Sequence, residues 1–117
     1  MLKKAEGLIR KKKDIKAYYY LLTSYAAMGK KDEVFAVWER LKKSGKKVLN
    51  KGYRDMISSL AKLGDFEAAE KILDKWESRK SPGYDVRIPH VLVSAYMKVG
   101  RLEEVGAVVE RTRSKGV

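Results

Sequence analysis

The chain has 117 residues, enough for one domain of ordinary size, and its 27 Lys and Arg against 15 Asp and Glu leave a net charge of +12. The absence of cysteine and the single histidine exclude disulfide bonds, thiolate metal sites and histidine-based metal clusters, and no apolar run is long enough to span a membrane. So basic a balance favours a polyanionic partner, nucleic acid or an anionic membrane surface, but a merely solvating surface explains the composition equally well.

The first predicted element lies in residues 1–14. The stretch "LKKAEGLI" in this segment matches "FEAAEKIL" later in the chain, so we interpret residues 2–12 as the second helix of a unit whose first helix is missing. The segment is basic, as transit peptides are, but it contains Glu6 and no serine, which argues against a targeting sequence.

One phrase then occurs three times, as "YAAMGKKDEVFAVW", "LAKLGDFEAAEKIL" and "YMKVGRLEEVGAVV". The glycines of the three phrases, Gly29, Gly64 and Gly100, stand 35 and 36 residues apart. A period of this length is typical of solenoids built from stacked units.

Each phrase joins two amphipathic helices, because apolar residues recur at i, i+3, i+4 and i+7 on both sides of the glycine. The first helices are expected at 16–27, 51–62 and 87–98, with the apolar sets Tyr18, Leu21, Leu22, Tyr25; Tyr53, Met56, Ile57, Leu60; and Pro89, Leu92, Val93, Tyr96. The second helices are expected at 31–43, 66–77 and 102–113, with the sets Val34, Val37, Trp38, Leu41; Ala69, Ile72, Leu73, Trp76; and Val105, Val108, Val109, Thr112.

The joins between the two helices are short, so the helices of a unit are expected to be antiparallel neighbours. Each glycine can take the left-handed conformation that ends a helix. Asp65 can cap the second helix of its unit, whereas Lys30 and Arg101 cannot do so. Pro89 fits the first turn of its helix, and "KSGKKVLNKG" and "SRKSPGYD" indicate turns between units.

A single helix pair cannot bury both of its apolar stripes, but stacked pairs bury them against each other. We therefore predict an all-α fold, a right-handed α-solenoid of stacked helix-turn-helix units. The expected organisation is a truncated repeat at 1–14, full repeats at 15–49 and 50–85, and a third repeat at 86–117 that is incomplete at its end, within what we expect to be a longer array.

The pattern "Y..L...Y...G..DE....W......G" resembles the pentatricopeptide repeat, most closely that of plant organellar members. It is carried here by "AYYYLLTSYAAMGKKDEVFAVWERLKKSG", "GYRDMISSLAKLGDFEAAEKILDKWESRK" and "IPHVLVSAYMKVGRLEEVGAVVERTRSKG". The related tetratricopeptide repeat, which usually binds protein, favours a small residue in the middle of the first helix, where this chain has Leu22, Ile57 and Val93.

The resemblance implies that single-stranded RNA binds along a concave face built from the first helices, in a mitochondrion or chloroplast. In the family, two residues per unit read one base, and the matching pairs here are Tyr19 with Leu49 and Arg54 with Asp85, while His90 begins a third pair. The family usually has small polar residues at the first position and Asp, Asn or Ser at the second, so only Asp85 conforms. Lys62 and Lys98 match a family lysine that is expected to face phosphate.

The distribution of charged residues indicates the same face independently of the family resemblance. The first helices carry the cations Lys16, Lys51, Arg54, Lys62, Arg87 and Lys98 and one acid, Asp55, whereas the second helices carry ten of the fifteen acids. Helix dipoles account for part of this sorting, because acids crowd the starts of the second helices, but not for the shortage of acids along the first helices.

Three residues share one face of each first helix and combine a cation, a planar or cationic group and a hydroxyl group. The rows are Lys16, Tyr19, Thr23; Lys51, Arg54, Ser58; and Arg87, His90, Ser94. The cations can neutralise phosphates, and Tyr19, Arg54 and His90 can stack on unpaired bases.

The candidate RNA-binding set is thus Lys16, Tyr19, Lys51, Arg54, Lys62, Asp85, Arg87, His90 and Lys98. No phosphate-binding glycine loop or nucleophile–base pair is apparent, so we expect no enzyme activity, no cofactor, no metal and no small-molecule substrate. Two functions remain open: a weakly base-specific binder of single-stranded RNA, and a scaffold that contacts ribosomal RNA and proteins within an assembly such as an organellar ribosome.

Overall fold

The computed structural model describes residues 15–79 and 83–115, and these form six α-helices and no strand. The helices are α2 (Ile15–Ala27), α3 (Lys31–Lys43), α4 (Asn50–Lys62), α5 (Phe66–Ser78), α6 (Arg87–Lys98) and α7 (Leu102–Arg113). Each bound lies within one residue of the expected one. The helix expected at 2–12, in the predicted unit 1–14, lies outside the described residues.

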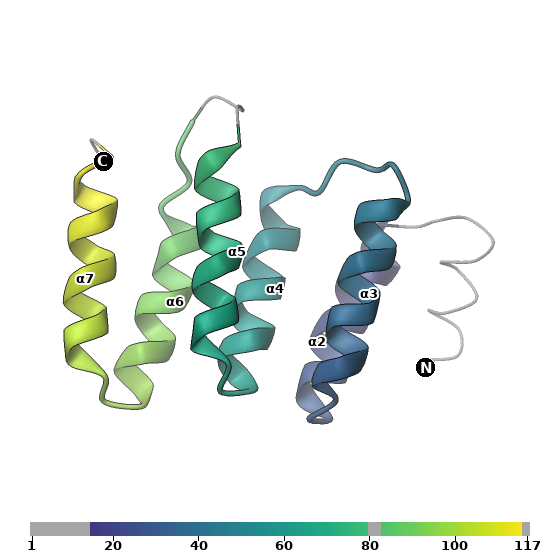
Figure 1. The fold of residues 1–117 in the computed structure, drawn as a ribbon, viewed down its shortest axis with the longest axis horizontal. Helices are drawn as coiled ribbons and strands as arrows, with labels where there is room; N and C mark the ends of the chain where they lie inside the picture. The colour runs from purple at the N-terminus through teal and green to yellow at the C-terminus, as the bar shows by residue number, and fades with distance from the viewer. Residues whose placement is uncertain (1–14, 80–82, 116–117) are drawn as a thin grey trace.

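The helices form two layers, with α2, α4 and α6 behind α3, α5 and α7 in the view of Figure 1. Each first helix packs against the second helix of its own pair, and α4 packs against both α2 and α6. The all-α solenoid of stacked helix pairs is therefore confirmed.

The same turn ends all three first helices. Gly29, Gly64 and Gly100 have φ angles of 73°, 81° and 75°, in the left-handed region that glycine adopts without strain. In each turn the residue after the glycine donates its N–H to a carbonyl five residues back, for example Asp65 to Leu60 at 2.9 Å. This bond satisfies a carbonyl at the helix end, so the turn reverses the chain without leaving that acceptor unpaired.

The starts of the second helices differ as expected. The Asp65 side chain accepts a hydrogen bond from the Ala68 N–H at 3.1 Å, whereas Lys30 and Arg101 form no side-chain cap. The helices without a cap begin with two acids each, Asp32 and Glu33 in α3 and Glu103 and Glu104 in α7, which the positive end of the helix dipole favours.

Aromatic contacts join one helix pair to the next. Trp38 of α3 meets Tyr53 of α4 edge to face with ring centroids 5.8 Å apart. Phe66 of α5 stacks on Tyr96 of α6 at 4.6 Å, and the Arg101 guanidinium lies over both rings. These rings lie on the predicted apolar stripes or beside them, so the stripes form the core of the stack and not a ligand site.

Ion pairs link successive second helices. Lys31 of α3 pairs with Asp65, the cap of α5, at 3.1 Å. Arg111 of α7 pairs with Glu77 of α5 at 2.7 Å and also with Asp74. The layer of second helices is thus connected largely by charged side chains, whereas the layer of first helices is connected by apolar packing.

Burial of the second-helix stripes is complete in the first two pairs and incomplete in the third. All four stripe residues of α3 and of α5 are buried, but in α7 only Val108 is, and Val109 is 39% exposed. The physical reason is that no further helix pair packs beyond α6 and α7 in the described part of the chain. Pro89 lies in the first turn of α6, as expected.

We predict that Leu60→Ala or Trp76→Ala lowers the free energy of unfolding by roughly 2–5 kcal/mol, because each side chain is at most 1% exposed and its loss leaves a cavity. Urea denaturation measures the change. Leu102→Ala is the matched control, since Leu102 is 68% exposed and should cost far less. A denaturation midpoint that moves equally in Leu60→Ala and in the control would contradict the assignment of the core.

Candidate RNA-binding face

The surface of α2, α4 and α6 that carries the candidate residues is called the first-helix face here. Five of its cations are exposed to solvent: Lys16, Lys51, Lys62, Arg87 and Lys98. Arg54 is half-buried between them. The face therefore presents positive charge from one end of the described stack to the other.

A hollow of about 480 Å³ lies where α2 meets the start of α4. Its lining includes Lys16, Tyr20 and Thr23 of α2 together with Leu49 and Lys51 at the start of α4. The structure thus brings the first-unit candidates together with residues of the next unit, as the resemblance implied for Tyr19 and Leu49.

Tyr19 itself is not available to stack on a base, and this expectation is corrected. Its side chain is only 4% exposed, and its hydroxyl oxygen accepts the backbone N–H of Leu49 at 3.1 Å. Burial raises the pKa of the Tyr19 hydroxyl, so the ring remains neutral. Tyr19 forms part of the wall of the hollow and serves the contact between α2 and α4.

Gly52 makes this placement of Tyr19 possible. A Cβ atom at position 52 would lie 2.6 Å from Cε1 of Tyr19, closer than carbon atoms approach in proteins. A glycine inside a helix costs stability relative to alanine, so the close approach of the ring is the reason for the residue.

Tyr20 is the aromatic residue that the sequence analysis missed. It follows Tyr19 directly, lines the same hollow and is 39% exposed. Its spacing of four residues from Lys16 and three from Thr23 places it on their face of the helix. Tyr20, and not Tyr19, is therefore the ring that an unpaired base can reach.

Lys51 is held by an acid of its own helix. Its Nζ lies 2.8 Å from Oδ2 of Asp55, one turn later, and 5.9 Å from the centre of the Tyr19 ring. Asp55 is the single acid within the first helices, and this pair neutralises it.

Asp85, the implied base-reading acceptor, is also engaged. Its Oδ1 accepts from the backbone N–H of Arg87 at 3.0 Å and from Nε of Arg87 at 2.9 Å. Its Oδ2 accepts from Nη2 of Arg87 at 2.8 Å and from the Asn50 amide at 3.3 Å. A carboxylate has about four acceptor positions, so a base could bind Asp85 only by displacing one of these donors.

The Asn50 amide connects this carboxylate to the core. Its oxygen accepts from the indole N–H of Trp76 at 3.0 Å and from Arg79 at 3.4 Å, while its nitrogen donates to Asp85. A connected set of polar groups therefore lies where α4, α5 and the start of α6 meet. The hydrogen bonds from Arg87 are the main reason that the pKa of Asp85 falls from 3.8 to about 2.

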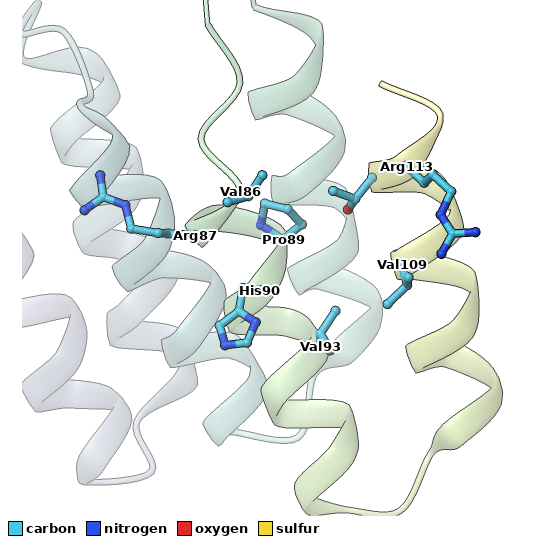
Figure 2. A pocket seen from close by; sticks show the side chains of 8 residues that line it. Val86, Arg87, Pro89, His90, Val93, Val109 and Arg113 are labelled. Carbon is cyan, nitrogen blue, oxygen red and sulfur yellow. The ribbon is translucent and has the colours of Figure 1, made fainter. Parts of the chain in front are cut away.

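His90 is exposed on α6, with its Nε2 at 3.3 Å from the hydroxyl of Ser94. Arg87 and His90 also border a second hollow, between α6 and α7 (Figure 2). Thr23 and Ser94 keep the hydroxyl groups of their rows on the face, although Thr23 bonds back to the Tyr20 carbonyl at 3.1 Å.

Other chemistry finds no support in the described residues. None of the six helices is long and apolar enough to cross a membrane. Within residues 15–79 and 83–115, no three or more His, Cys, Asp or Glu side chains gather in a way that could hold a metal ion.

The family model of the PPR repeat matches residues 16–45, 53–81 and 90–117, and each match spans most of one helix pair. The chain belongs to the pentatricopeptide repeat family. The repeats indicate a family of RNA-binding proteins.

Among similar pentatricopeptide repeat proteins, one from Arabidopsis thaliana whose name places it in mitochondria is 41% identical over 109 residues, covering 93% of this chain and 22% of the relative. Another Arabidopsis mitochondrial member is 34% identical over 99 residues, 85% of this chain and 18% of the relative. The Arabidopsis large ribosomal subunit protein mL101 is 35% identical over 104 residues, 89% of this chain and 21% of that protein. The chain spans about a fifth of the length of these relatives.

We predict a pH dependence that isolates the Asp85–Arg87 pair. Because the pKa of Asp85 is depressed in the folded state, its contribution to stability is complete above about pH 4 and is lost as the pH falls toward 2. Asp85→Asn, which can still accept a hydrogen bond from the Arg87 N–H, should lower the free energy of unfolding at pH 7 and approach the parent protein near pH 2.

Chemical denaturation at several pH values checks this prediction. Arg87→Gln is the companion variant and should remove most of the same pH dependence, since Arg87 is the main cause of the shift. A deficit of Asp85→Asn that stays constant from pH 7 to pH 2 would contradict the assignment.

Proposed function

We propose that the first-helix face of this pentatricopeptide repeat chain binds single-stranded RNA through phosphate contacts and base stacking, with weak base specificity. The observation that carries the proposal is the division of charge between the two helix layers. Helices α2, α4 and α6 hold six Lys and Arg and one acid, which Lys51 neutralises.

The other layer is close to neutral. Helices α3, α5 and α7 carry eight Lys and Arg, which leaves a formal charge of −2, against +5 for α2, α4 and α6. Their ten acids are Asp32, Glu33, Glu39, Glu67, Glu70, Asp74, Glu77, Glu103, Glu104 and Glu110. A phosphate chain is therefore attracted more strongly to the first-helix face than to the second helices, which favours a defined binding face over diffuse attraction to the net charge.

Weak base specificity is supported by the engagement of the reading positions. Tyr19 is buried, Asp85 accepts four hydrogen bonds, and Leu49, which is 52% exposed, has no side-chain hydrogen-bonding group. The groups that remain accessible are mainly cations, together with the rings of Tyr20 and His90. Both act on features that every nucleotide shares, the phosphate and the π-face of the base.

We propose that the protein acts in an organelle, a mitochondrion or a chloroplast, because the names of several relatives include the word mitochondrial. The chain spans about a fifth of the length of these relatives. The proposal therefore concerns the contribution of these units and not the activity of a whole protein.

A second function, that of a scaffold on ribosomal RNA and proteins, is favoured by one observation: a relative at 35% identity is a large ribosomal subunit protein. A scaffold has no need of free base-reading positions, and in this chain Tyr19 and Asp85 at those positions are engaged within the fold. The two functions differ in whether isolated single-stranded RNA binds to the first-helix face.

We predict that replacing Lys16, Lys51, Lys62 and Lys98 together with Gln abolishes RNA binding or weakens it at least tenfold. Arg87 is left in place because its loss would uncover the charge of Asp85. All four lysines are exposed, so the fold should persist. Loss of four phosphate contacts should also lower the salt slope of log K by up to about 3. Fluorescence anisotropy with a short unstructured RNA measures both quantities.

The matched control replaces Lys42, Lys43, Lys46 and Lys47 with Gln. These are also four exposed lysines, and each set breaks one ion pair within its own helix, Lys51–Asp55 or Lys42–Glu39. The control should bind RNA almost as well as the parent. Equal weakening by both sets would leave only net charge as the explanation, and an absence of RNA binding even at low salt would favour the scaffold.

We further predict that Tyr20→Ala weakens RNA binding about 5- to 150-fold, which corresponds to the roughly 1–3 kcal/mol of one stacked base. Its thermal midpoint should change little because the ring is partly exposed. Tyr20→Phe, which keeps the π-face, should restore binding. If Tyr20→Ala binds as tightly as the parent, the hollow between α2 and α4 does not take a base.

A further inference from the structure

A basic patch lies outside the first-helix face, where α3 ends and the chain crosses to α4. Residues 34–50 contain five Lys and Arg and one acid, a formal charge of +4 out of the +12 of the whole chain. In Figure 1 this connection crosses the upper edge of the molecule and reaches the start of α4. Four of the cations are exposed lysines and are called the junction patch here: Lys42, Lys43, Lys46 and Lys47.

The turn that carries the junction patch is held by local contacts. The Ser44 hydroxyl donates to the Leu41 carbonyl at 2.6 Å and accepts the backbone N–H of Lys46 at 3.2 Å. Gly45 between them has a φ angle of 80°, in the left-handed region that glycine adopts without strain. The backbone that bears the four lysines therefore follows a defined path between the two helices.

The single acid beside the patch is shared among several cations. Lys42 pairs with Glu39, one turn earlier in α3, at 3.0 Å. The pKa of the Glu39 carboxyl is lowered mainly by Lys42, with smaller contributions from Lys43 and from Lys75 of α5. The second helices are close to neutral as a layer, but at this edge of the molecule they are positive.

The other lysines of the patch have no acid to neutralise them. Lys43, Lys46 and Lys47 form no ion pair with any acid in residues 15–79 and 83–115. The dipole of α3 favours Lys43 at its C-terminal end, but Lys46 and Lys47 lie beyond the helix. Lysines held this close together repel one another, so a polyanion that lies against them is favoured.

The patch offers charge without an apolar or aromatic anchor. None of the large exposed hydrophobic side chains lies within residues 34–48. Unpaired RNA is usually bound by cations together with rings on which its bases stack, and stable membrane attachment needs an apolar signal beside a basic cluster. An RNA duplex presents a dense row of phosphates and keeps its paired bases in a deep, narrow groove, so charge alone can bind it.

We propose that the junction patch binds the phosphate backbone of an RNA duplex, such as the stem of a hairpin. RNA is favoured over an acidic protein segment because the repeats indicate a family of RNA-binding proteins. The position of the patch also fits, since Lys47 is followed four residues later by Lys51 of the first-helix face. A strand that leaves that face at the start of α4 therefore reaches the patch. The inference goes beyond the proposed function, because it concerns a different surface and a different form of RNA.

The test compares two probes on the full chain by fluorescence anisotropy: a short blunt-ended RNA duplex and an unstructured RNA of the same length. Replacing the four lysines of the junction patch with Gln should weaken duplex binding at least about tenfold and lower the salt slope of log K by up to about 3.6. All four side chains are exposed, so the urea midpoint should change little. Replacing the same four with Arg, which keeps the charge, should preserve duplex binding.

The matched control replaces Lys16, Lys51, Lys62 and Lys98 with Gln, which removes the same charge from the first-helix face. This variant should bind the duplex within about threefold of the parent, whereas its affinity for the unstructured RNA should fall. The two variants therefore have opposite effects on the two probes. If the duplex binds through the patch and the unstructured RNA does not bind at all, the proposed function fails and this inference stands.

Three outcomes would overturn the inference. One is a parent protein that does not bind the duplex even at low salt. Another is equal weakening of duplex binding by both variants, which would leave net charge as the explanation. The third is a patch that prefers another polyanion: polyglutamate or vesicles of phosphatidylcholine and phosphatidylserine that bind the parent more tightly than the duplex does, and that the junction variant no longer binds.

Discussion

The whole stack depends on the close packing of α4 between α2 and α6. A helix pair with two apolar stripes can bury one of them within itself, so each pair needs a neighbour, and the first helices supply the contact. This contact is tight enough that position 52 tolerates no side chain beyond hydrogen, because the ring of Tyr19 fills the space. The second helices, in contrast, are joined by ion pairs that span longer gaps, such as Arg111 with Glu77. Apolar packing on one layer and charged links on the other allow the two layers to differ in composition.

That difference connects the fold to the proposed function. The acids needed to start and link the second helices lie on α3, α5 and α7, so few acids remain near the first-helix face. Asp55 and Asp85, which do lie near that face, are each paired with a cation one turn away or closer. These two pairs lower the negative charge that a phosphate chain would meet, and they also hold Lys51 and Arg87 in defined positions. Lys51 and Arg87 therefore have a role in the folded protein, and the proposed function gives them a second role toward a polyanion.

Most of the fold could be predicted from the sequence, because the period of the glycines and the i, i+3, i+4, i+7 sets report local geometry that tertiary contacts do not alter. The site could be predicted only in part. The helical spacing correctly placed Lys16 and Thr23 on one surface, but Tyr19 lies at the edge of that surface, where a rotation of the helix by a fraction of a turn decides between solvent and core. Tyr18 and Tyr19 are buried whereas Tyr20 is exposed, and the Tyr19 ring occupies space left by Gly52, 33 residues away. The network of Asp85, Arg87 and Asn50 also joins residues that are far apart in the sequence. No local sequence pattern predicts it.

The different positions of Tyr19 and Tyr20 show how packing between units limits base recognition in this chain. Tyr19 stabilises the junction between units by accepting a hydrogen bond from Leu49 and packing on Gly52, so it is lost as a reader of bases. At the next junction Asp85 is engaged in the same way, since its carboxylate accepts hydrogen bonds from the backbone N–H of Arg87, the first residue of α6, and from the Arg87 side chain. Both residues lie where one unit meets the next, and there a side chain that closes the junction is not free to contact a ligand. A chain that uses these positions for its own cohesion retains general affinity for a polyanion through its exposed lysines, whereas discrimination between bases requires side chains that the junctions do not need.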